Sequence, residues 1–439
     1  MHDAAAPTTD LTSAAVGPRT PRLPLAVYVL AVGTFLMLTT EFVVAGILPD
    51  IADDVQVSVA RTGLLITVFA IGMIVGAPLM AMLTLRLSQR LTLMLALAVF
   101  AVGHVVVAVS SQFGVLLAAR FFTALATGAF WAVAAVVATR VAGPGAASRA
   151  VGVVGAGGSL ATVLGVPLGA LAAQAIGWRG TFWALALLAV AAVPLIARHV
   201  TDDSDDVPTA SIRTELTALR SGRLWLVLAA CATTTGGVLA AYSFITPLLT
   251  DRTGISANLV PLVLAGFGVG SLVGSLIGGR LGDTRPHTAT IVAPAVTTLV
   301  LLALCLVSQA AVPTTVLIVL MGFFGLGANP ILISLAVRYA DHAPTLGSSL
   351  AVAAFNFGTA VASWVGALAL ESSLGAVGPV AVGTVVSALT LVPATALAVS
   401  VRRHQRAADQ HRLTSTAPVH ASPSDALSDD QLAVACSTS

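Results

Sequence analysis

Two ionisable residues lie deep within long apolar runs of the sequence, where a charged side chain costs at least ~2.5–3.5 kcal/mol on membrane-insertion scales. Glu41 precedes Pro49 by eight residues, and Arg120 follows Gly114 by six residues. In helices that rise 1.5 Å per residue, these two residues would lie about 12 Å and about 9 Å below the predicted outer ends of their runs. Opposite charges at matching depth predict that Glu41 and Arg120 meet as an ion pair.

Such a pair can move a proton. If Glu41 takes up a proton from one side, it releases Arg120 and changes the contacts between two helices, which couples proton entry to a conformational change. A static ion pair that ties the two helices together explains the same residues equally well. Both interpretations therefore stand at this point: a proton-coupling site or a structural ion pair.

The runs that carry these residues have the length and composition of membrane-spanning helices. The chain of 439 residues is 57% hydrophobic and 9% charged, with a mean hydropathy of +0.97, whereas a soluble domain carries roughly a quarter charged residues. Apolar runs of about twenty residues, enough to cross a ~30 Å hydrocarbon core, alternate with short polar connectors. We predict twelve spans, near 24–48, 62–84, 91–110, 115–139, 150–173, 180–197, 224–248, 260–281, 288–308, 314–338, 347–370 and 379–400.

Arginine placement predicts the orientation, because positively charged residues concentrate in cytoplasmic loops. With both termini cytoplasmic, 17 of the 21 arginines fall inside, Arg61, Arg179 and Arg252 fall outside, and Arg120 lies within a span. The tail is too polar to bury a core and is expected to be disordered. We predict a cytoplasmic N-terminal segment, a first six-helix bundle, a cytoplasmic linker, a second six-helix bundle and a disordered cytoplasmic tail, at 1–23, 24–197, 198–223, 224–400 and 401–439.

Matching glycines in the two halves indicate an internal duplication. Small residues at such intervals let helices approach closely in lipid, which by itself explains their presence. Their occurrence at corresponding places favours an all-α membrane protein of two pseudo-symmetric bundles with a site between them. The matching pairs are Gly157 and Gly165 with Gly358 and Gly366, and Gly72 and Gly76 with Gly270 and Gly274.

Other kinds of chemistry find no support in the sequence. Every basic residue is arginine, so a Walker phosphate loop and a pyridoxal Schiff base are excluded along with every other lysine-dependent site. Cys231, Cys305 and Cys436 lie far apart without metal-ligand spacing. We expect no enzyme activity, no cofactor, no metal and no nucleic-acid partner.

A few polar and aromatic residues within the spans are candidates for ligand contacts. Tyr242, Asn329 and Asn356 could orient a ligand between the bundles, and Phe130 could form an aromatic wall. Helix packing explains each of them equally well. His104 could relay protons, although a neutral histidine hydrogen-bonded between helices is the favoured interpretation.

Several motifs carry a family resemblance. They are Thr40-Glu41-Phe42 with Gly46-Ile47-Leu48-Pro49, Arg120 with Gly128-Ala129-Phe130, Gly157 with Gly165, Pro167 and Gly169, and Gly177-Trp178-Arg179-Gly180-Thr181-Phe182-Trp183. From about Leu25 to Ser400 the chain resembles the major facilitator superfamily, specifically its twelve-span bacterial drug:proton antiporters, and is most similar to chloramphenicol-resistance exporters. Ala124 stands where the family more often has glycine, and Val166 is inserted before the proline of the antiporter motif.

The resemblance also implies residues that act in the conformational cycle. The family's Gly-x-x-x-Asp loop between spans two and three is degraded to Arg86 and Arg90 without its aspartate. Its copy in the second half is better preserved, so the latch between these loops would be asymmetric. Gly165 and Pro167 would permit a bend in span five. The residues of the second-half copy are Gly279, Asp283 and Arg285.

The resemblance implies a proton-coupled exporter of small lipophilic drugs, with phenicols the expected cargo. It further implies a multi-pass monomer in the bacterial inner membrane, whose partners are the drug, protons and the bilayer. A cavity with one carboxylate suits neutral or weakly polar compounds. Two rivals stand beside this expectation: a sugar, nutrient or metabolite transporter of the same superfamily, and a membrane sensor that binds ligand without net flux.

Overall fold

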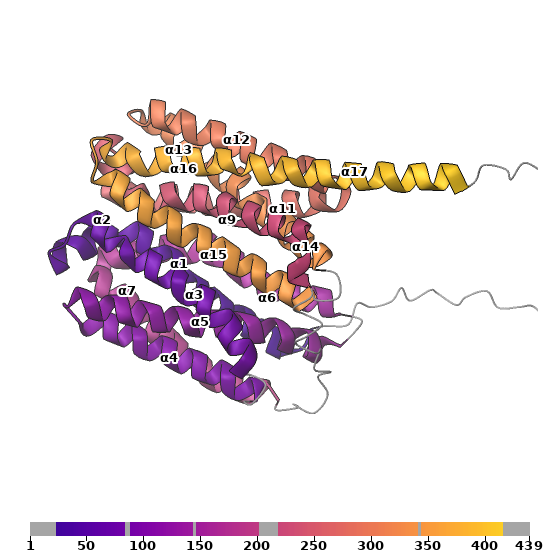
Figure 1. Ribbon diagram of the computed structural model, residues 1–439. Coiled ribbons are helices and arrows are strands. Elements are labelled where there is room, and N and C mark those ends of the chain that lie inside the picture. The colour runs from indigo at the N-terminus through magenta and orange to yellow at the C-terminus, as the bar shows by residue number, and fades with distance from the viewer. Residues whose placement is uncertain (1–22, 84–87, 144–145, 202–217, 341–343, 416–439) are drawn as a thin grey trace, which may run out of the picture.

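The structure, a computed structural model, describes residues 23–83, 88–143, 146–201, 218–340 and 344–415. All regular elements in this part of the chain are helices (Figure 1). Helices suit this composition because every backbone N–H and C=O can be paired within one segment, as an apolar medium requires. The predicted N-terminal segment, apart from Leu23, and most of the predicted 198–223 linker lie outside the described residues.

The first half of the chain forms the helices of one bundle. Two of these helices begin at a serine that accepts a hydrogen bond from a nearby backbone N–H, Ser58 at α2 and Ser88 at α4. The elements are α1 (Leu25–Val55), α2 (Val59–Thr62), α3 (Leu64–Leu83), α4 (Gln89–Val109), α5 (Phe113–Ala142), α6 (Ala147–Leu160), the π-helical turn η1 (Ala161–Gly165) and α7 (Val166–His199).

The second half repeats this arrangement. The elements are η2 (Ala218–Arg220), α9 (Gly222–Ser243), α10 (Ile245–Pro247), η3 (Leu248–Arg252), η4 (Ala257–Leu259), α11 (Val260–Thr284), α12 (Pro286–Val307), α13 (Ala311–Met321), the π-helical turn η5 (Gly322–Leu326), α14 (Asn329–Tyr339), α15 (Pro344–Leu370), η6 (Gly375–Val377), α16 (Gly378–Leu389) and α17 (Leu391–Ser415).

The predicted count of twelve spans is confirmed. Within the described residues, eleven continuous helical segments are long and apolar enough to cross a membrane. One of them, Ala150–His199, has 50 residues and contains two spans. The two meet at Gly177, whose φ of 76° and ψ of 161° are not helical and are open to glycine at little cost.

Two helices continue past their predicted ends. Pro49 does not end the first span, because α1 continues to Val55 and stops at Gln56, which adopts a left-handed conformation with φ 57°. Helix α17 runs past residue 401 to Ser415 and projects from the bundle (Figure 1), and the rest of the predicted tail lies outside the described residues. Residues 401–415 contain neither glycine nor proline and are rich in arginine, alanine and glutamine, which favour helices.

The glycines confirm the pseudo-symmetry of the two halves, because corresponding glycines pack against corresponding helices. Gly157 and Gly165 abut Ala31 and Thr39 of α1, while Gly358 and Gly366 abut Ala232 and Ala240 of α9. In the same way, Gly72 and Gly76 of α3 face α5, and Gly270 and Gly274 of α11 face α13 and η5. At each contact the missing side chain lets two helices approach closely.

The two bundles share one apolar core at one end and have separate cores at the other. At the end that contains Arg179, here called the Arg179 end, one apolar core includes Val43 and Ile47 of α1 together with Phe244 and Leu264 of the second half. At the opposite end, here called the Arg140 end, the core is split into two clusters, one built only from the first half and one only from the second. Figure 1 shows the two halves side by side, and α15 packs against both α9 and α3.

The contact between α9 and α15 predicts a sharp response to a small change. In Gly358→Ala, the added methyl group would overlap with the backbone carbonyl of Ala232 and force the two helices apart. Overpacking of this kind costs about 1–3 kcal/mol. We expect a lower melting temperature for the purified protein, measured by temperature-dependent size-exclusion chromatography. Gly152→Ala is the matched control, because a methyl group there meets open space; equal melting of the two variants would contradict this packing.

Candidate functional site

A cavity lies between the two bundles, next to Glu41. Its walls are apolar apart from the Glu41 carboxyl and a few hydroxyl groups, and Glu41 is the one carboxylate among the lining residues. Four helices line it, α1, α3, α9 and α15, so both halves of the chain contribute. The lining residues are Glu41, Phe42, Ala45, Ile66, Phe69, Ala70, Leu239, Tyr242, Ser243 and Thr359.

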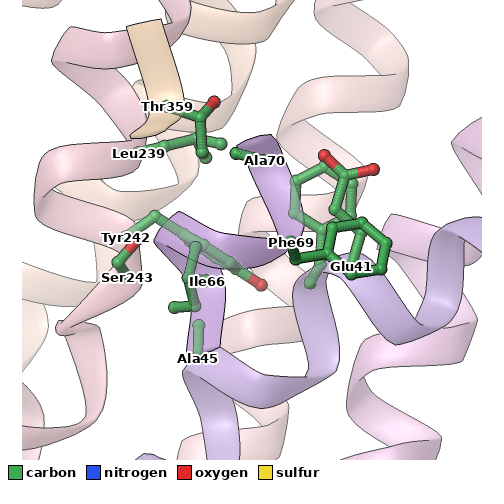
Figure 2. Close-up of a pocket in the computed structure, with 10 residues that line it drawn as sticks. Glu41, Ala45, Ile66, Phe69, Ala70, Leu239, Tyr242, Ser243 and Thr359 are labelled. Atoms are coloured by element: carbon green, nitrogen blue, oxygen red, sulfur yellow. The ribbon is translucent and has the colours of Figure 1, made fainter. Parts of the chain in front are cut away.

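Tyr242 of α9 provides the largest side chain from the second half. It is buried, stacks on Phe267 with ring centres 4.3 Å apart, and meets Phe42 edge to face at 6.3 Å. Figure 2 shows Tyr242 on the α9 side of the cavity, extending toward the side where Phe69 and Glu41 lie. Aromatic packing therefore holds the wall opposite Glu41 in place.

Arg120 of α5 is fully enclosed next to this cavity. Its Nη1 donates to the carbonyl oxygen of Thr40 at 3.1 Å and to the Thr40 hydroxyl at 2.9 Å, and its Nε points at the carbonyl of Leu65 at 3.5 Å. The guanidinium carbon lies 4.1 Å from the centre of the Phe69 ring. Hydrogen bonds and a cation–π contact thus stabilise the buried cation, while its Nη2 has no partner.

The predicted ion pair between Glu41 and Arg120 is absent from the structure. Within the described residues, the salt bridge observed joins Arg179 and Asp54, and no nitrogen of Arg120 lies within 4.0 Å of a Glu41 oxygen. Neighbouring positions on a helix point about 100° apart. Thr40 therefore faces Arg120, and Glu41 turns toward the cavity between the bundles. The matching depth was correct, but depth carries no information about direction around the helix.

The other predicted ligand residues do not line the cavity, apart from Tyr242. Phe130 is fully buried in the core of the first bundle, where its ring packs against Gly33. Asn356 donates to the carbonyl of Val352 in its own helix at 3.0 Å. Asn329 begins α14, and its buried Oδ1 has no partner. Their roles in ligand binding stay predictions, and this cavity supports only Tyr242.

Comparison with known families decides what kind of protein carries this cavity. The model of the family described as Major Facilitator Superfamily matches residues 30–346 and, in a second match, residues 244–436. The chain belongs to the major facilitator superfamily. It is accordingly a multi-pass membrane transporter, as the motifs in the sequence predicted.

Relatives of this facilitator are found in several bacteria. It is 36% identical over 376 residues to the chloramphenicol resistance protein of Streptomyces lividans, and the aligned region covers 84% of this chain and 95% of the relative. It is 30% identical over 363 residues to the inner membrane transport protein YdhP of Escherichia coli (strain K12), with 83% and 93% covered.

A solved structure has the same fold as this facilitator. A bacterial homologue of the human lysosomal transporter Spinster, in an inward-facing and unoccupied conformation, superposes with a TM-score of 0.63 and 16% sequence identity. The match covers 85% of this chain and 95% of that one. This likeness supports the two-bundle architecture.

Span five of the facilitator contains a π-helical turn just before Pro167, and the bend predicted there stays a prediction. The helix widens into η1, which ends at Gly165, and the N–H of Val166 bonds back five residues to the carbonyl of Ala161. Proline has no N–H with which to continue the regular ladder. Turns of this type are frequent at functional sites, and Gly165 lets η1 pack against Thr39, one residue before Thr40.

The predicted latch residues are only partly described. Arg86 lies outside the described residues, and the side chain of Asp283 is not among those described. Arg90 is partly buried near the start of α4, and Arg285 is exposed where α11 ends. Gly279 faces open space, so packing does not require glycine there. The roles of all five residues stay predictions.

Sequence reasoning missed some polar partners at the site. Thr40 is the direct partner of Arg120, although it was read only as part of a motif. Its signal is a hydroxyl residue adjacent to a carboxylate within an apolar span. Thr67 of α3 and Ser363 of α15 lie 2.9 Å apart across the two bundles. No pattern in the sequence pairs residues so far apart.

Proposed function

We propose that the protein is a proton-coupled antiporter that exports small lipophilic drugs by alternating access, with chloramphenicol or related phenicols as its substrates. The observation that carries this proposal is Glu41, the one carboxylate among the residues that line an apolar cavity between the two bundles. A carboxylate in such surroundings binds a proton when the site is dry and releases it when water reaches the site.

The surroundings of Glu41 favour a neutral cargo. The rest of the cavity wall consists of aromatic and aliphatic side chains with the hydroxyl groups of Tyr242, Ser243 and Thr359. When the bundles move apart along this wall, a lipophilic molecule with a few polar groups gains from burying its apolar surface against it, while the hydroxyl groups can bond its polar atoms. A relative with 36% identity bears the name chloramphenicol resistance protein, which supports the choice of phenicols.

The arginine distribution supports the proposed orientation of the protein in the membrane. We place the protein as a monomer in the bacterial inner membrane with both termini cytoplasmic, so that the Arg179 end faces outward. The bundles share one apolar core at that end and have separate cores at the Arg140 end. In this orientation the structure corresponds to the state that is closed to the outside.

Transport by inverted membrane vesicles tests the proposal. Vesicles that acidify their interior should take up radiolabelled chloramphenicol, and adding the drug should release protons from the interior. An uncoupler should abolish the uptake, because the proton gradient supplies the energy. Uptake that persists unchanged after the gradient collapses would exclude antiport and favour a nutrient-type carrier. Unchanged chloramphenicol susceptibility and accumulation in expressing cells would exclude export of chloramphenicol.

A further inference from the structure

A directed series of buried hydrogen bonds runs from Arg120 in α5 to a histidine in the neighbouring helix α4. Arg120 Nη1 donates to the hydroxyl oxygen of Thr40 at 2.9 Å. That oxygen lies 2.8 Å from Nε2 of His104, and Nδ1 of His104 lies 2.7 Å from the carbonyl oxygen of Phe100. Arg120 and His104 are each 1% exposed and Thr40 is 0% exposed. This series connects α5, α1 and α4 without any contact with bulk water.

For a neutral His104, only one arrangement of protons satisfies all these contacts. The carbonyl of Phe100 can only accept, so Nδ1 of His104 carries a hydrogen. Arg120 can only donate, so the Thr40 hydroxyl accepts from Arg120 and directs its own hydrogen elsewhere. Nε2 of His104 takes that hydrogen and must therefore be bare. A neutral His104 therefore carries its proton on Nδ1, and each of these hydrogen bonds points from Arg120 toward Phe100.

The surroundings of the imidazole support the neutral form. Phe100 stacks on the ring with centres 4.0 Å apart, and Phe182 of α7 lies against it at 5.6 Å. Most of the packing around α4 comes from α5 and α7, and α1 reaches it through Thr40. The charged groups nearest in this network are the Arg120 cation of α5 and, one residue beyond Thr40 on α1, Glu41. A second positive charge on His104 would meet Arg120 across a single hydroxyl group.

These hydrogen bonds determine which nitrogens of Arg120 already have an acceptor. Nη1 is held by two oxygen atoms of Thr40, while Nη2 is buried and has no acceptor. Nη2 is therefore the donor that remains for a new acceptor. Glu41 lies next to Thr40 in α1, so a fixed Thr40 also fixes the guanidinium relative to the backbone that carries Glu41.

We propose that His104 is a positioning residue for the proton-coupling site: its neutral imidazole accepts the Thr40 hydroxyl hydrogen and thereby presents the hydroxyl lone pairs to Arg120. His104 exchanges no proton itself. This role rests on the proposed coupling by Glu41 and Arg120. It differs from a histidine relay, in which His104 would change its charge during transport, and from simple helix packing, in which Arg120 would not sense His104.

Nitrogen NMR of the full-length protein in nanodiscs tests the positioning without any substrate. With ¹⁵N-labelled histidine and His104→Gln to identify the signal, His104 should remain neutral with a bare Nε2 between about pH 5 and 8. With ¹⁵N-labelled arginine and Arg120→Lys for identification, His104→Leu and Thr40→Val should each shift the Arg120 side-chain signals. A His104 signal that titrates, or an Arg120 signal that His104→Leu does not move, would overturn the proposal.

Drug-driven proton release supplies the functional comparison. Loss of a hydrogen bond that orients a charged group predicts roughly tenfold weaker proton release for His104→Leu and for Thr40→Val. His104 and Thr40 act through the same series of hydrogen bonds, so the double variant should release protons no more weakly than either single variant. Independent effects would instead multiply to about a hundredfold. Multiplication would overturn the proposal. His104→Gln, which keeps an acceptor near Thr40, should restore part of the release.

A second histidine provides a matched control. His199 of α7 makes the same bond within its helix, from Nδ1 to the carbonyl of Leu195 at 2.9 Å, but it is partly exposed and lies outside this series of hydrogen bonds. His199→Leu should leave both the Arg120 signals and proton release unchanged. If the unmodified protein releases no protons on addition of chloramphenicol, the proposed function fails, and the NMR signals still decide whether His104 positions Arg120.

Discussion

Replacing Glu41 with glutamine should abolish gradient-driven accumulation of chloramphenicol by inverted vesicles. Glutamine has nearly the same shape but binds no proton, so the variant keeps the cavity wall and loses only the charge change. The protein should still insert and fold, because a neutral amide is less costly in an apolar span than a carboxylate. We also expect exchange of labelled for unlabelled drug to continue without a proton gradient, since that reaction requires no net proton movement.

Glu371 supplies the matched control for this variant. It lies at the Arg179 end, where its carboxylate accepts a hydrogen bond from Ser58 at 2.8 Å and is exposed. An amide oxygen in Glu371→Gln can accept the same bond, so accumulation should persist. Full gradient-driven accumulation by Glu41→Gln would remove Glu41 from the coupling step. Loss of exchange together with accumulation would indicate a binding role for Glu41 instead.

The fold could be predicted from the sequence because lipid imposes one strong requirement on the chain. Each span needs about twenty apolar residues, and breaks such as Gly177 separate neighbours that a helix would otherwise join. The duplication was visible for a related reason. Close approach of two helices requires a small residue, so Gly157 and Gly358 mark the same packing in both halves.

The details of the site could not be predicted in the same way. Counting residues from a helix end gives depth, and the depth of Arg120 agrees with its contact at Thr40. Which residue of α1 faces Arg120 depends on the rotation of two helices about their axes, and that rotation is set by packing across the whole bundle. An error of one residue turns a side chain by about 100°, from Glu41 to Thr40.

Hydrogen bonds between residues of the two halves could not be predicted from the sequence for another physical reason. The contacts between the bundles, such as Thr246 of α10 donating to the carbonyl of Ala45 at 3.0 Å, exist in this arrangement of the two halves. In the proposed cycle they form and break during each turnover. Short polar side chains in such places resemble the many threonines that bond only to their own helix, such as Thr34 to Leu30.

A cross-link between α3 and α15 should stop transport. The hydroxyl oxygens of Thr67 and Ser363 lie 2.9 Å apart, and each belongs to a different bundle. Cysteines at both positions, in a background in which Cys231, Cys305 and Cys436 are replaced, can close a bond of about 2.05 Å between their sulfur atoms with small rotations. Alternating access requires these helices to separate, so we expect chloramphenicol uptake to fall to background after oxidation and to recover after reduction.

A disulfide within one bundle serves as a control, because it distinguishes the effect of cross-linking the two bundles from the effect of the oxidising treatment. Cys305 of α12 lies 3.8 Å from the hydroxyl of Thr384 in α16, and both helices belong to the second half. Thr384→Cys, with Cys305 retained and the other two cysteines replaced, should cross-link and remain active, because a bundle that rocks as a rigid body does not separate these helices. Transport that survives complete cross-linking of α3 to α15 would contradict the proposed motion. Equal loss in both cross-linked proteins would show that transport requires movement within a bundle.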